Sequence, residues 1–562
     1  MNSTSLSAKS RQFPDRIFIL PVGGCGEFGM NLTVYAYRGR SYIVDCGLAF
    51  AEPFEIGIDA HIPSPDLLEE ILGEPPAAFL ITHGHEDHLG ALPFFLERWN
   101  TPVYIGPWAR ELLAEKLQQR GDRTTYSINP IKEGDRITVG DITVDWIHVP
   151  HSIPFCFSLV IQAGDMRIVH TGDFKTKGYH PYDADLLPST LDAIAKSGPT
   201  LALVADSTNA HAPGFCPSEA TVIPELKRVV QGARGVSYIS TFSSNLWRLK
   251  SILDIAQELD KKVFIFGTGM RKSVELGVKL KLLNQEIKVL IDEEGLRSTA
   301  RKDLIVICTG CQGEYRSGLR RIIEDDVRFL EILPHDQIIF SSRMIPGNEK
   351  SIAKMVSLGT FKGADIITAK EYPSIHVSGH AYAEDLKLFL DRLKPRFHIP
   401  VHGTFTQMRA NQHLAEADSF LSMSNGRLLS LGHAGAQVED EYELERLFVD
   451  SWSRQPMDYA TMRARHKIGD SGMALVSGLL GQGKDQLEVE FVGLPFASLE
   501  IEEAFQSELV HALFNLYKRL NTNGLTADTY NEQARLLIRR ALTDRFVKKP
   551  IVFSKVFLMS GL

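Results

Sequence analysis

The chain has 562 residues, of which 44% are hydrophobic and 23% charged, and its formal net charge is −8 at pH 7. This length is too great for one hydrophobic core and predicts several domains, while the composition is ordinary for a globular protein. The acidic balance excludes a global basic field, so any contact with phosphate groups has to come from local positive charge.

No stretch approaches the apolar length that spans a bilayer, and residues 1–16 are polar and lack the apolar region of a signal peptide. We therefore expect a cytoplasmic protein without a membrane partner. The six cysteines are scattered, which does not indicate a disulfide framework. Cys308 and Cys311 directly follow an apolar run, and we interpret them as small side chains at a strand end rather than as a redox or metal pair.

The first predicted strand, residues 18–21, leads into a glycine-rich stretch at residues 23–31. The glycines permit a tight, close-packed turn. A phosphate-binding loop is the alternative, but no Gly-Lys-Ser/Thr follows and the spacing is not the dinucleotide-binding fingerprint. Residues 32–44 are typical of a hairpin that ends at Asp45. A carboxylate at this position is placed to hydrogen-bond a metal-ligating histidine.

The stretch 82–90, Thr-His-Gly-His-Glu-Asp-His-Leu-Gly, is the strongest motif in the chain. It follows the apolar run 78–81 and precedes a helical pattern, so it predicts a strand-to-helix turn. Imidazole and carboxylate ligands in such a cluster suit zinc or manganese. One turn cannot wrap four side chains around one ion and also leave a catalytic position open, so we expect two neighbouring ions completed by ligands from elsewhere. A polar surface turn is the alternative. The four ligand-type side chains are His83, His85, Asp87 and His88.

Later strand ends carry further ligand-type residues. His151 and Asp173 each follow a predicted strand, and a third strand, residues 397–401, ends at His402. Between them, over residues 206–370, strands alternate with helices, which predicts a parallel sheet with crossover connections. The late return of histidine at a strand end indicates that the first domain is interrupted by an insert and completed afterwards.

The end of the chain has a different pattern. Residues 451–470 are polar and predict a linker, and the strands and helices after it predict a small α+β domain. The predicted boundaries are 1–205 and 371–450 for the interrupted first domain, 206–370 for the insert, 451–470 for the linker and 471–562 for the C-terminal domain.

Several motifs recur in a recognisable set: His83-Gly-His-Glu-Asp-His88, His151-Ser-Ile-Pro154, His170-Thr-Gly-Asp173 and Pro400-Val-His402-Gly403, and later in the chain His376-Val-Ser-Gly-His380. The first four together resemble the metallo-β-lactamase superfamily, and the last motif with the insert resembles its nucleic-acid-processing β-CASP branch. Within that branch the chain resembles the ribonuclease J family. The resemblance implies an α/β fold: a metallo-β-lactamase αββα sandwich, an inserted β-CASP α/β domain and a small α+β C-terminal domain.

The resemblance implies a metal-dependent ribonuclease that acts on single-stranded RNA in decay and maturation, with 5′-to-3′ exonuclease and endonuclease activity. Two divalent ions, zinc or manganese, would activate water for attack on phosphorus. His380 is our candidate for contacting the scissile phosphate or protonating the leaving oxygen, with Asp87 and His88 as further catalytic residues. The implied ligands are His83, His85 and His151 for one ion, Asp87, His88 and His402 for the other, and Asp173 between them; the implied phosphate-binding residues are His376, Val377, Ser378, Gly379 and His380.

The resemblance also implies a structural calcium at Gly57, Asp59 and Asp450, a homodimer or homotetramer, and partners in an RNA-degradation complex. Two other classes compete with this reading: a small-molecule hydrolase of the same metal fold, and a catalytically weak RNA-binding subunit. The insert and the β-CASP motif argue against the first, and the complete ligand set argues against the second. Candidate basic contacts to RNA are Lys175, Lys177, Arg271, Lys272 and Arg316.

The chain departs from the family pattern at a few positions beside the motifs. No metal ligand is lost, so these departures bear on substrate preference and on the balance of exonuclease and endonuclease activity. They are Phe155, Cys156, Thr404, Thr406, Cys25 and Phe28.

Overall fold

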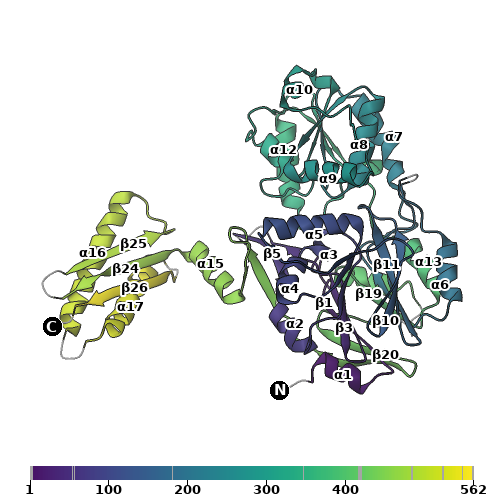
Figure 1. The fold of residues 1–562 in the computed structure, drawn as a ribbon. Coiled ribbons are helices and arrows are strands. Elements are labelled where there is room, and N and C mark those ends of the chain that lie inside the picture. The colour runs from purple at the N-terminus through teal and green to yellow at the C-terminus, as the bar shows by residue number, and fades with distance from the viewer. Residues whose placement is uncertain are drawn as a thin grey trace. The chain divides into compact units, whose positions relative to one another are not determined.

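The structure is a computed structural model that describes residues 4–52, 55, 57–179, 182–345, 347–415, 421–481, 485–521, 525–546 and 549–559. The chain forms two compact units (Figure 1). The larger unit contains Met1–Ala51 and Ala60–Arg446, and the smaller unit contains Glu52–Asp59 and Leu447–Leu562. Within the described part of the chain, every helix is too short or too polar to span a membrane.

The first layer of the larger unit is an eight-stranded sheet in the order β21-β20-β1-β2-β3-β6-β7-β8. β1 to β3 pair in antiparallel fashion, as the predicted hairpin requires, whereas β3, β6, β7 and β8 run parallel. The strands are β1 (Ile17–Gly23), β2 (Leu32–Tyr37), β3 (Arg40–Val44), β6 (Ala78–Ile81), β7 (Val103–Ile105), β8 (Ile128–Pro130), β20 (Arg427–Gly432) and β21 (Gly435–Glu441).

The second layer is a six-stranded sheet in the order β19-β13-β12-β11-β10-β9. Its inner face packs against the first sheet, where Tyr35 and Leu80 of the first sheet share one buried core with Trp146 and Ile161 of the second. The strands are β9 (Arg136–Val139), β10 (Ile142–Val149), β11 (Cys156–Ala163), β12 (Met166–His170), β13 (Ala202–Asp206) and β19 (Phe397–Val401).

Helices cover the outer faces of both sheets. Phe95 of α4 (Leu92–Arg98) packs its ring 6.4 Å from that of Phe79 in the first sheet. On the other side, Leu191 of α6 (Pro188–Lys196) and Phe389 of α13 (Ala383–Leu393) belong to the core that includes the outward face of the second sheet. The layers are therefore helix, sheet, sheet and helix, which confirms the predicted αββα sandwich.

The insert forms a five-stranded sheet of its own, in the order β15-β16-β14-β17-β18. All its pairings are parallel, and helices cover it (Figure 1), which confirms the predicted crossover pattern. The elements are β14 (Ser237–Ser240), β15 (Lys262–Phe266), β16 (Leu304–Cys308), β17 (Gln337–Phe340), β18 (Asp365–Thr368), α7 (Ile223–Gln231), α8 (Leu246–Glu258), α9 (Thr268–Lys279), α10 (Glu293–Ser298), α11 (Gly318–Ile323) and α12 (Glu349–Phe361).

The insert leaves from β13 and returns at β19, and these two strands are parallel neighbours, with Asp206 opposite Val401. The interrupted domain is thus resumed beside the strand at which it stopped. Cys308 and Cys311 are both buried free cysteines, and burial raises the pKa of both thiols above the usual range. This environment agrees with small side chains at the end of β16.

The smaller unit contains a three-stranded sheet in the order β25-β24-β26, with two long helices packed on one face. The stretch predicted as a linker, residues 451–470, contains most of α15 (Tyr459–Ser471). This helix is polar except for buried Met462, so its sequence has the composition of a linker. The other elements are β24 (Met473–Leu480), β25 (Gln486–Val492), α16 (Leu499–Leu520), α17 (Ala527–Phe546) and β26 (Ile551–Leu558), of which β26 was not predicted.

The helix face of α17 provides a test of the small core. Ile538 is completely buried, whereas Leu536 on the same helix is 44% exposed. We expect Ile538→Ala to destabilise the smaller unit by about 2–5 kcal/mol because it leaves a cavity, and Leu536→Ala to change stability by about 0.5 kcal/mol or less. Hydrogen exchange of peptides from α17 and β24 measures both, and equal loss of protection in the two variants would contradict this packing.

Candidate active site

The candidate site lies where parallel strands of both sheets end. β3 and β6 end side by side, and the backbone N–H of Thr82 donates to the Asp45 carboxylate at 2.7 Å. In the second sheet, β12, β13 and β19 are parallel neighbours, so the residues after them also meet at one edge. Asp45 and His402 hold left-handed backbone conformations, with φ of 60° and 54°. Such strain in non-glycine residues is typical of functional sites.

The first group of donors consists of His83, His85, His151 and Asp173, whose ligand atoms all lie within 4.8 Å of one another. His85 Nδ1 is 3.0 Å from His83 Nε2 and 3.2 Å from His151 Nε2. Burial holds the pKa of His83 and His151 well below the ordinary value and lowers that of His85 to about 4. These imidazoles are therefore neutral, which is the form that binds a metal ion.

The second group consists of Asp87, His88, Asp173 and His402, again within 4.8 Å. His402 Nε2 is 3.4 Å from Asp87 Oδ2, and His88 Nε2 is 3.3 Å from Asp173 Oδ2. Although burial opposes it, His88 and His402 hold the pKa of the Asp87 carboxyl well below its usual range. Asp173 belongs to both groups, so the sequence-predicted set of seven converges on one carboxylate.

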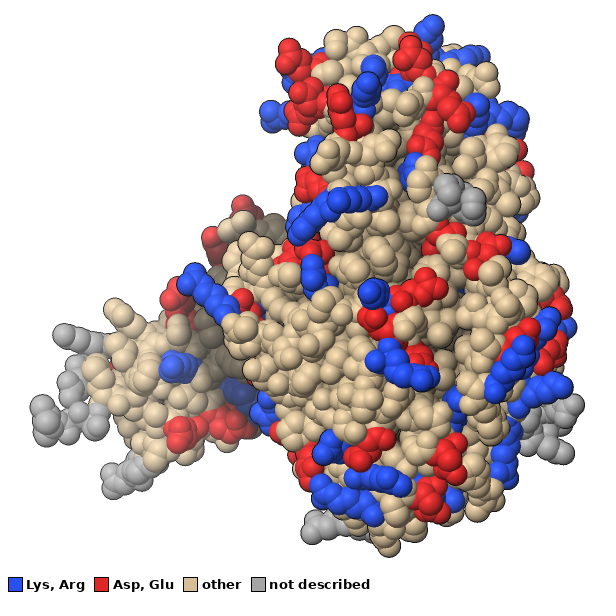
Figure 2. Space-filling model, turned by 45° about the vertical axis from the view of Figure 1, so that its right-hand side comes forward, with Lys and Arg blue, Asp and Glu red and all other residues tan. Residues whose placement is uncertain are grey.

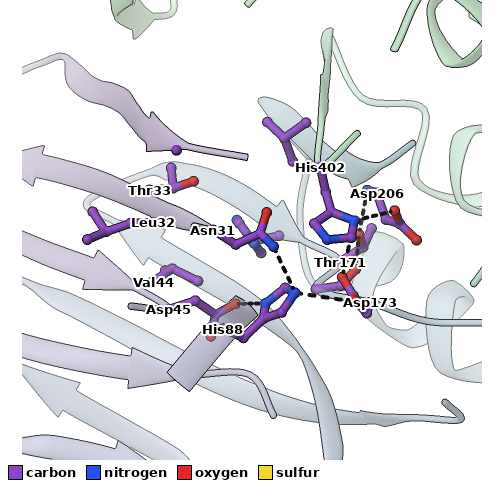
Figure 3. A pocket seen from close by; sticks show the side chains of 14 residues that line it. Asn31, Leu32, Thr33, Val44, Asp45, His88, Thr171, Asp173, Asp206 and His402 are labelled. Atoms are coloured by element: carbon purple, nitrogen blue, oxygen red, sulfur yellow. Dashed lines mark hydrogen bonds and ion pairs between the residues drawn. The ribbon is translucent and has the colours of Figure 1, made fainter. Parts of the chain in front are cut away.

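The histidines are held by partners outside the donor groups. Figure 3 shows His88 between Asp45 on one side and Asn31 and Asp173 on the other. In this arrangement one ring nitrogen is occupied by an outer partner and the other faces the donor group, as is usual for metal-ligating histidines. The outer contacts are His83 Nδ1–Thr82 Oγ1 at 3.0 Å, His88 Nδ1–Asp45 Oδ2 at 2.7 Å, His151 Nδ1–Gly379 O at 2.7 Å and His402 Nδ1–Asp206 Oδ1 at 3.0 Å.

This donor set fits divalent metal ions. Nitrogen and carboxylate oxygen are its only donors, and the buried Oδ1 of Asp173 has no hydrogen-bond partner among the described residues. A buried carboxylate oxygen without a partner is costly unless a cation or a donor satisfies it. The chemistry of the set suits zinc and manganese alike.

Asp206 is a site residue that the sequence analysis did not single out. Its Oδ2 lies 3.0 Å from His380 Nδ1 and its Oδ1 3.0 Å from His402 Nδ1. Burial lowers the pKa of His380, but the Asp206 and Asp173 carboxylates outweigh this effect and raise it above the ordinary value. A carboxylate directly at the end of a buried strand was the available signal, as it was for Asp45.

The predicted phosphate-binding residues, His376 to His380, form a loop beside the donor groups. The Gly379 carbonyl accepts from His151 Nδ1 at 2.7 Å, and Ser378 Oγ accepts from Asn209 Nδ2 at 2.8 Å. A Cβ on Gly379 would lie 2.7 Å from the His151 ring, so only glycine fits there. Val377 is buried, and the buried Nδ1 of His376 has no partner among the described residues.

The residues expected to hold calcium, Gly57, Asp59 and Asp450, lie in the smaller unit. Asp450 Oδ2 accepts from Arg465 Nη1 at 2.5 Å, and the same nitrogen is 3.4 Å from the Gly57 carbonyl. Hydrogen bonds from Ser453 and Arg465 hold the pKa of the Asp450 carboxyl below its usual range. Asp59 is exposed. Because a guanidinium already contacts two of the three expected ligands, this set does not fit calcium unless Arg465 moves.

Two further expectations change with the structure. Lys175 is not a surface contact for RNA, because it is only 2% exposed and its Nζ donates to backbone carbonyls. Lys272 forms an ion pair with Glu115.

Among the residues that depart from the family pattern, Thr404 caps α14 (Phe405–Gln412) through reciprocal hydrogen bonds with Gln407, which gives it a structural role.

The sandwich, the insert and the paired donor groups define a metallo-hydrolase of the metallo-β-lactamase superfamily with a β-CASP domain. Residues 26–210 match the model of the metallo-β-lactamase superfamily, residues 235–358 that of the ribonuclease J β-CASP domain, and residues 370–419 that of the Zn-dependent metallo-hydrolase RNA specificity domain. A solved structure of a protein of unknown function from Enterococcus faecalis covers 74% of this chain and 100% of its own, with a TM-score of 0.53 and 16% identity, and supports the fold alone.

Curated relatives place the chain more narrowly. It is 33% identical to ribonuclease J of Sinorhizobium meliloti over 553 residues, or 96% of each protein. It is 30% identical to ribonuclease J of Helicobacter pylori over 546 residues, or 95% of this chain and 78% of that protein. The chain belongs to the ribonuclease J family.

The convergence of donors predicts how metal content responds to substitution. The protein should hold two divalent ions per chain, one for each of the two donor groups described above. His151→Ala should lower this content because it removes a donor from the first group. His148→Ala is the matched control, since His148 is three residues away and contacts Asp183 at 2.9 Å, outside both groups. Elemental analysis of protein loaded with Zn²⁺ or Mn²⁺ measures both, and the same metal content in the two variants would argue against the assignment.

Proposed function

We propose that the chain is a metal-dependent ribonuclease that hydrolyses phosphodiester bonds of single-stranded RNA from the 5′ end, with internal cutting as a second mode. The observation that carries this proposal is the pair of donor groups sharing Asp173 directly beside the loop from His376 to His380. The names of its curated relatives, ribonuclease J, support the same activity.

In this proposal the two donor groups hold two ions, zinc or manganese. His83, His85 and His151 would hold one, Asp87, His88 and His402 the other, with Asp173 between them. When bound, the ions supply Lewis-acid stabilisation of phosphoryl oxygens and a water of lowered pKa. Asp45 and Asp206 orient the ligating rings through their outer nitrogens. We do not extend the proposal to calcium, because Arg465 contacts Asp450 and Gly57.

His380 is the residue proposed to move the proton. The carboxylates of Asp206 and Asp173 raise its pKa above the ordinary value despite burial, which stabilises the protonated form of the ring. Its ring lies 4.9 Å from that of His151, at the edge of the first donor group. An imidazolium there can donate to the departing 3′ oxygen as the P–O3′ bond breaks, which leaves the phosphate on the 5′ oxygen of the product.

Recognition of RNA would be local rather than through a wide basic surface. On the face drawn in Figure 2, lysine and arginine side chains are interspersed with acidic ones among the described residues. The loop at His376 to His380 falls within the match to an RNA specificity domain, residues 370–419. Its glycine amide and unpartnered His376 Nδ1 are suitable donors to a phosphate group. This supports phosphate contacts that do not depend on base sequence.

The competing classes have less support. A small-molecule hydrolase has no use for the insert with its parallel sheet or for the loop that contacts His151. A catalytically weak subunit would not need all seven donors, their outer partners and the Asp206–His380 pair. Membership of the ribonuclease J family is the support for partners in an RNA-degradation complex.

We also propose self-association through the smaller unit, as a homodimer or a tetramer built from it. The open face of its sheet carries an apolar stripe, because Leu479 pairs with Phe557 across β24 and β26, and Phe553 lies on the same face two alternations from Phe557, with Lys555 between them. These three side chains are 41%, 55% and 51% exposed, in that order. Exposed Lys555 on one edge strand and Glu488 on the other provide opposite charges for a two-fold arrangement.

Sedimentation velocity tests this association. The double variant Phe553→Glu/Phe557→Glu should lower the mass of the assembly, because it introduces charge into the apolar stripe. Phe361→Glu is the control, since Phe361 is 89% exposed in α12 of the insert. A monomeric wild type, or an unchanged mass in the double variant, would contradict this interface.

The nuclease proposal is tested with labelled 5′-monophosphate RNA and Mn²⁺. The wild type should degrade it, and mononucleotide release would identify the exonuclease mode. His380→Ala should lower kcat by about 100- to 10,000-fold, the usual contribution of a general acid, while metal content stays at the wild-type level. His148→Ala should keep its activity. No degradation by the wild type, or full activity of His380→Ala, would contradict the proposal.

A further inference from the structure

Lys175 has an unusual environment two residues after Asp173. It is 2% exposed, and its Nζ lies 3.2 Å from the Pro217 carbonyl and 3.2 Å from the Ser378 carbonyl. Among the described residues no carboxylate forms an ion pair with it. A buried ammonium that forms no direct ion pair is costly. The contact with the Ser378 carbonyl places Lys175 next to the loop from His376 to His380.

Two buried carboxylates lie near Lys175: Asp183, on which Lys175 acts electrostatically, and Asp385, but neither forms an ion pair with Lys175 among the described residues. Cys216 Sγ donates to the same Ser378 carbonyl at 3.2 Å, and burial raises the pKa of its thiol to about 12, so it is neutral. The nearby Asp385 carboxylate accepts backbone N–H groups of Thr176, Cys216 and Tyr382. The buried Arg248 contacts the Ile375 carbonyl but is paired with Glu219.

Two backbone carbonyls of the loop accept hydrogen bonds from buried side chains. Ser378 O points to Lys175, and Gly379 O points to His151. A trans peptide directs its N–H opposite to its C=O, so the Gly379 N–H faces away from Lys175. This N–H has no acceptor among the described residues. The Ser378–Gly379 peptide therefore lies with its negative end on the ammonium and its positive end on the opposite side.

We propose that Lys175 is a positioning residue for the substrate phosphate: its buried ammonium fixes and polarises the Ser378–Gly379 peptide, whose N–H donates to the bound phosphate. This inference rests on the proposed function, since it takes the loop as the phosphate site. Lys175 touches no substrate atom. It acts through the peptide dipole, and a charge at one end of a hydrogen-bonded chain strengthens the bond at the other end. The chemical class recognised is a phosphate ester of a nucleotide.

The substitutions Lys175→Met and Lys175→Gln separate charge from hydrogen bonding. Methionine removes both, whereas glutamine keeps a donor for the carbonyls and removes only the charge. Both variants should raise KM for 5′-monophosphate RNA and the inhibition constant of adenosine 5′-monophosphate by about tenfold, equivalent to about 1.4 kcal/mol, and kcat should change much less. Metal content should stay at the wild-type level, because Lys175 contacts no metal donor.

Lys261→Met is the matched control. Lys261 is 8% exposed, and its Nζ also donates to a backbone carbonyl, that of Lys302. Lys261 directly precedes β15, so it lies at the amino-terminal end of the parallel sheet. The opposite, carboxyl end of the sheet lies near the loop, because Ser341 follows β17 and its Oγ donates to the Ile375 carbonyl. The chemical change is the same, but the loop is not involved, so KM and nucleotide inhibition should remain as in the wild type.

The role of Lys175 and the proposed ribonuclease activity fail in different experiments. An inactive wild type with RNA overturns the proposed function itself. An active wild type whose Lys175 and Lys261 variants behave alike overturns the role of Lys175. The role is also overturned if Lys175→Gln restores wild-type KM, which would make the hydrogen bond sufficient, or if neither Lys175 variant folds, which would make the residue structural.

Discussion

The structure depends on Asp173, a single buried carboxylate around which the donor atoms of six other side chains face one another. In the protein alone this arrangement is unfavourable, because close, desolvated imidazoles and carboxylates are brought together and Asp173 Oδ1 has no hydrogen-bond partner among the described residues. Divalent cations at this site would reverse this balance by giving the inward-facing atoms a partner. The outer contacts of the rings, such as His88 with Asp45, keep those atoms oriented for the ions.

The fold supplies this geometry through parallel strand ends in two sheets. β13 and β19 lie side by side although the whole insert separates them in sequence, and this pairing places Asp206 next to His402. The returning chain also carries the loop whose Gly379 carbonyl accepts from His151. One hydrogen bond therefore links a proposed metal ligand, His151, to the proposed phosphate site, and the segment that follows the insert supplies this link.

The strand-end histidines were predictable because their signal is local: ligand-type residues directly after an apolar run, as at His83 and His402. Asp206 was not singled out, because one aspartate at a strand end gains its meaning only from the pairing of β13 with β19. The burial of Lys175 depends on a carbonyl 203 positions away in the chain, so a sequence pattern could not reveal it. The stretch containing α15 was predicted as a linker because its sequence is polar, and the helix indeed buries only Met462. β26 was not predicted, although its β-branched and aromatic residues are typical of a strand.

The most direct test of the central claim is anomalous X-ray diffraction from crystals grown with Mn²⁺, recorded on both sides of the manganese absorption edge. The account predicts two anomalous peaks about 3.5–4 Å apart, one on each side of the Asp173 carboxylate, with His151 at one and His402 at the other. A single peak, or peaks that do not touch Asp173, would contradict the account.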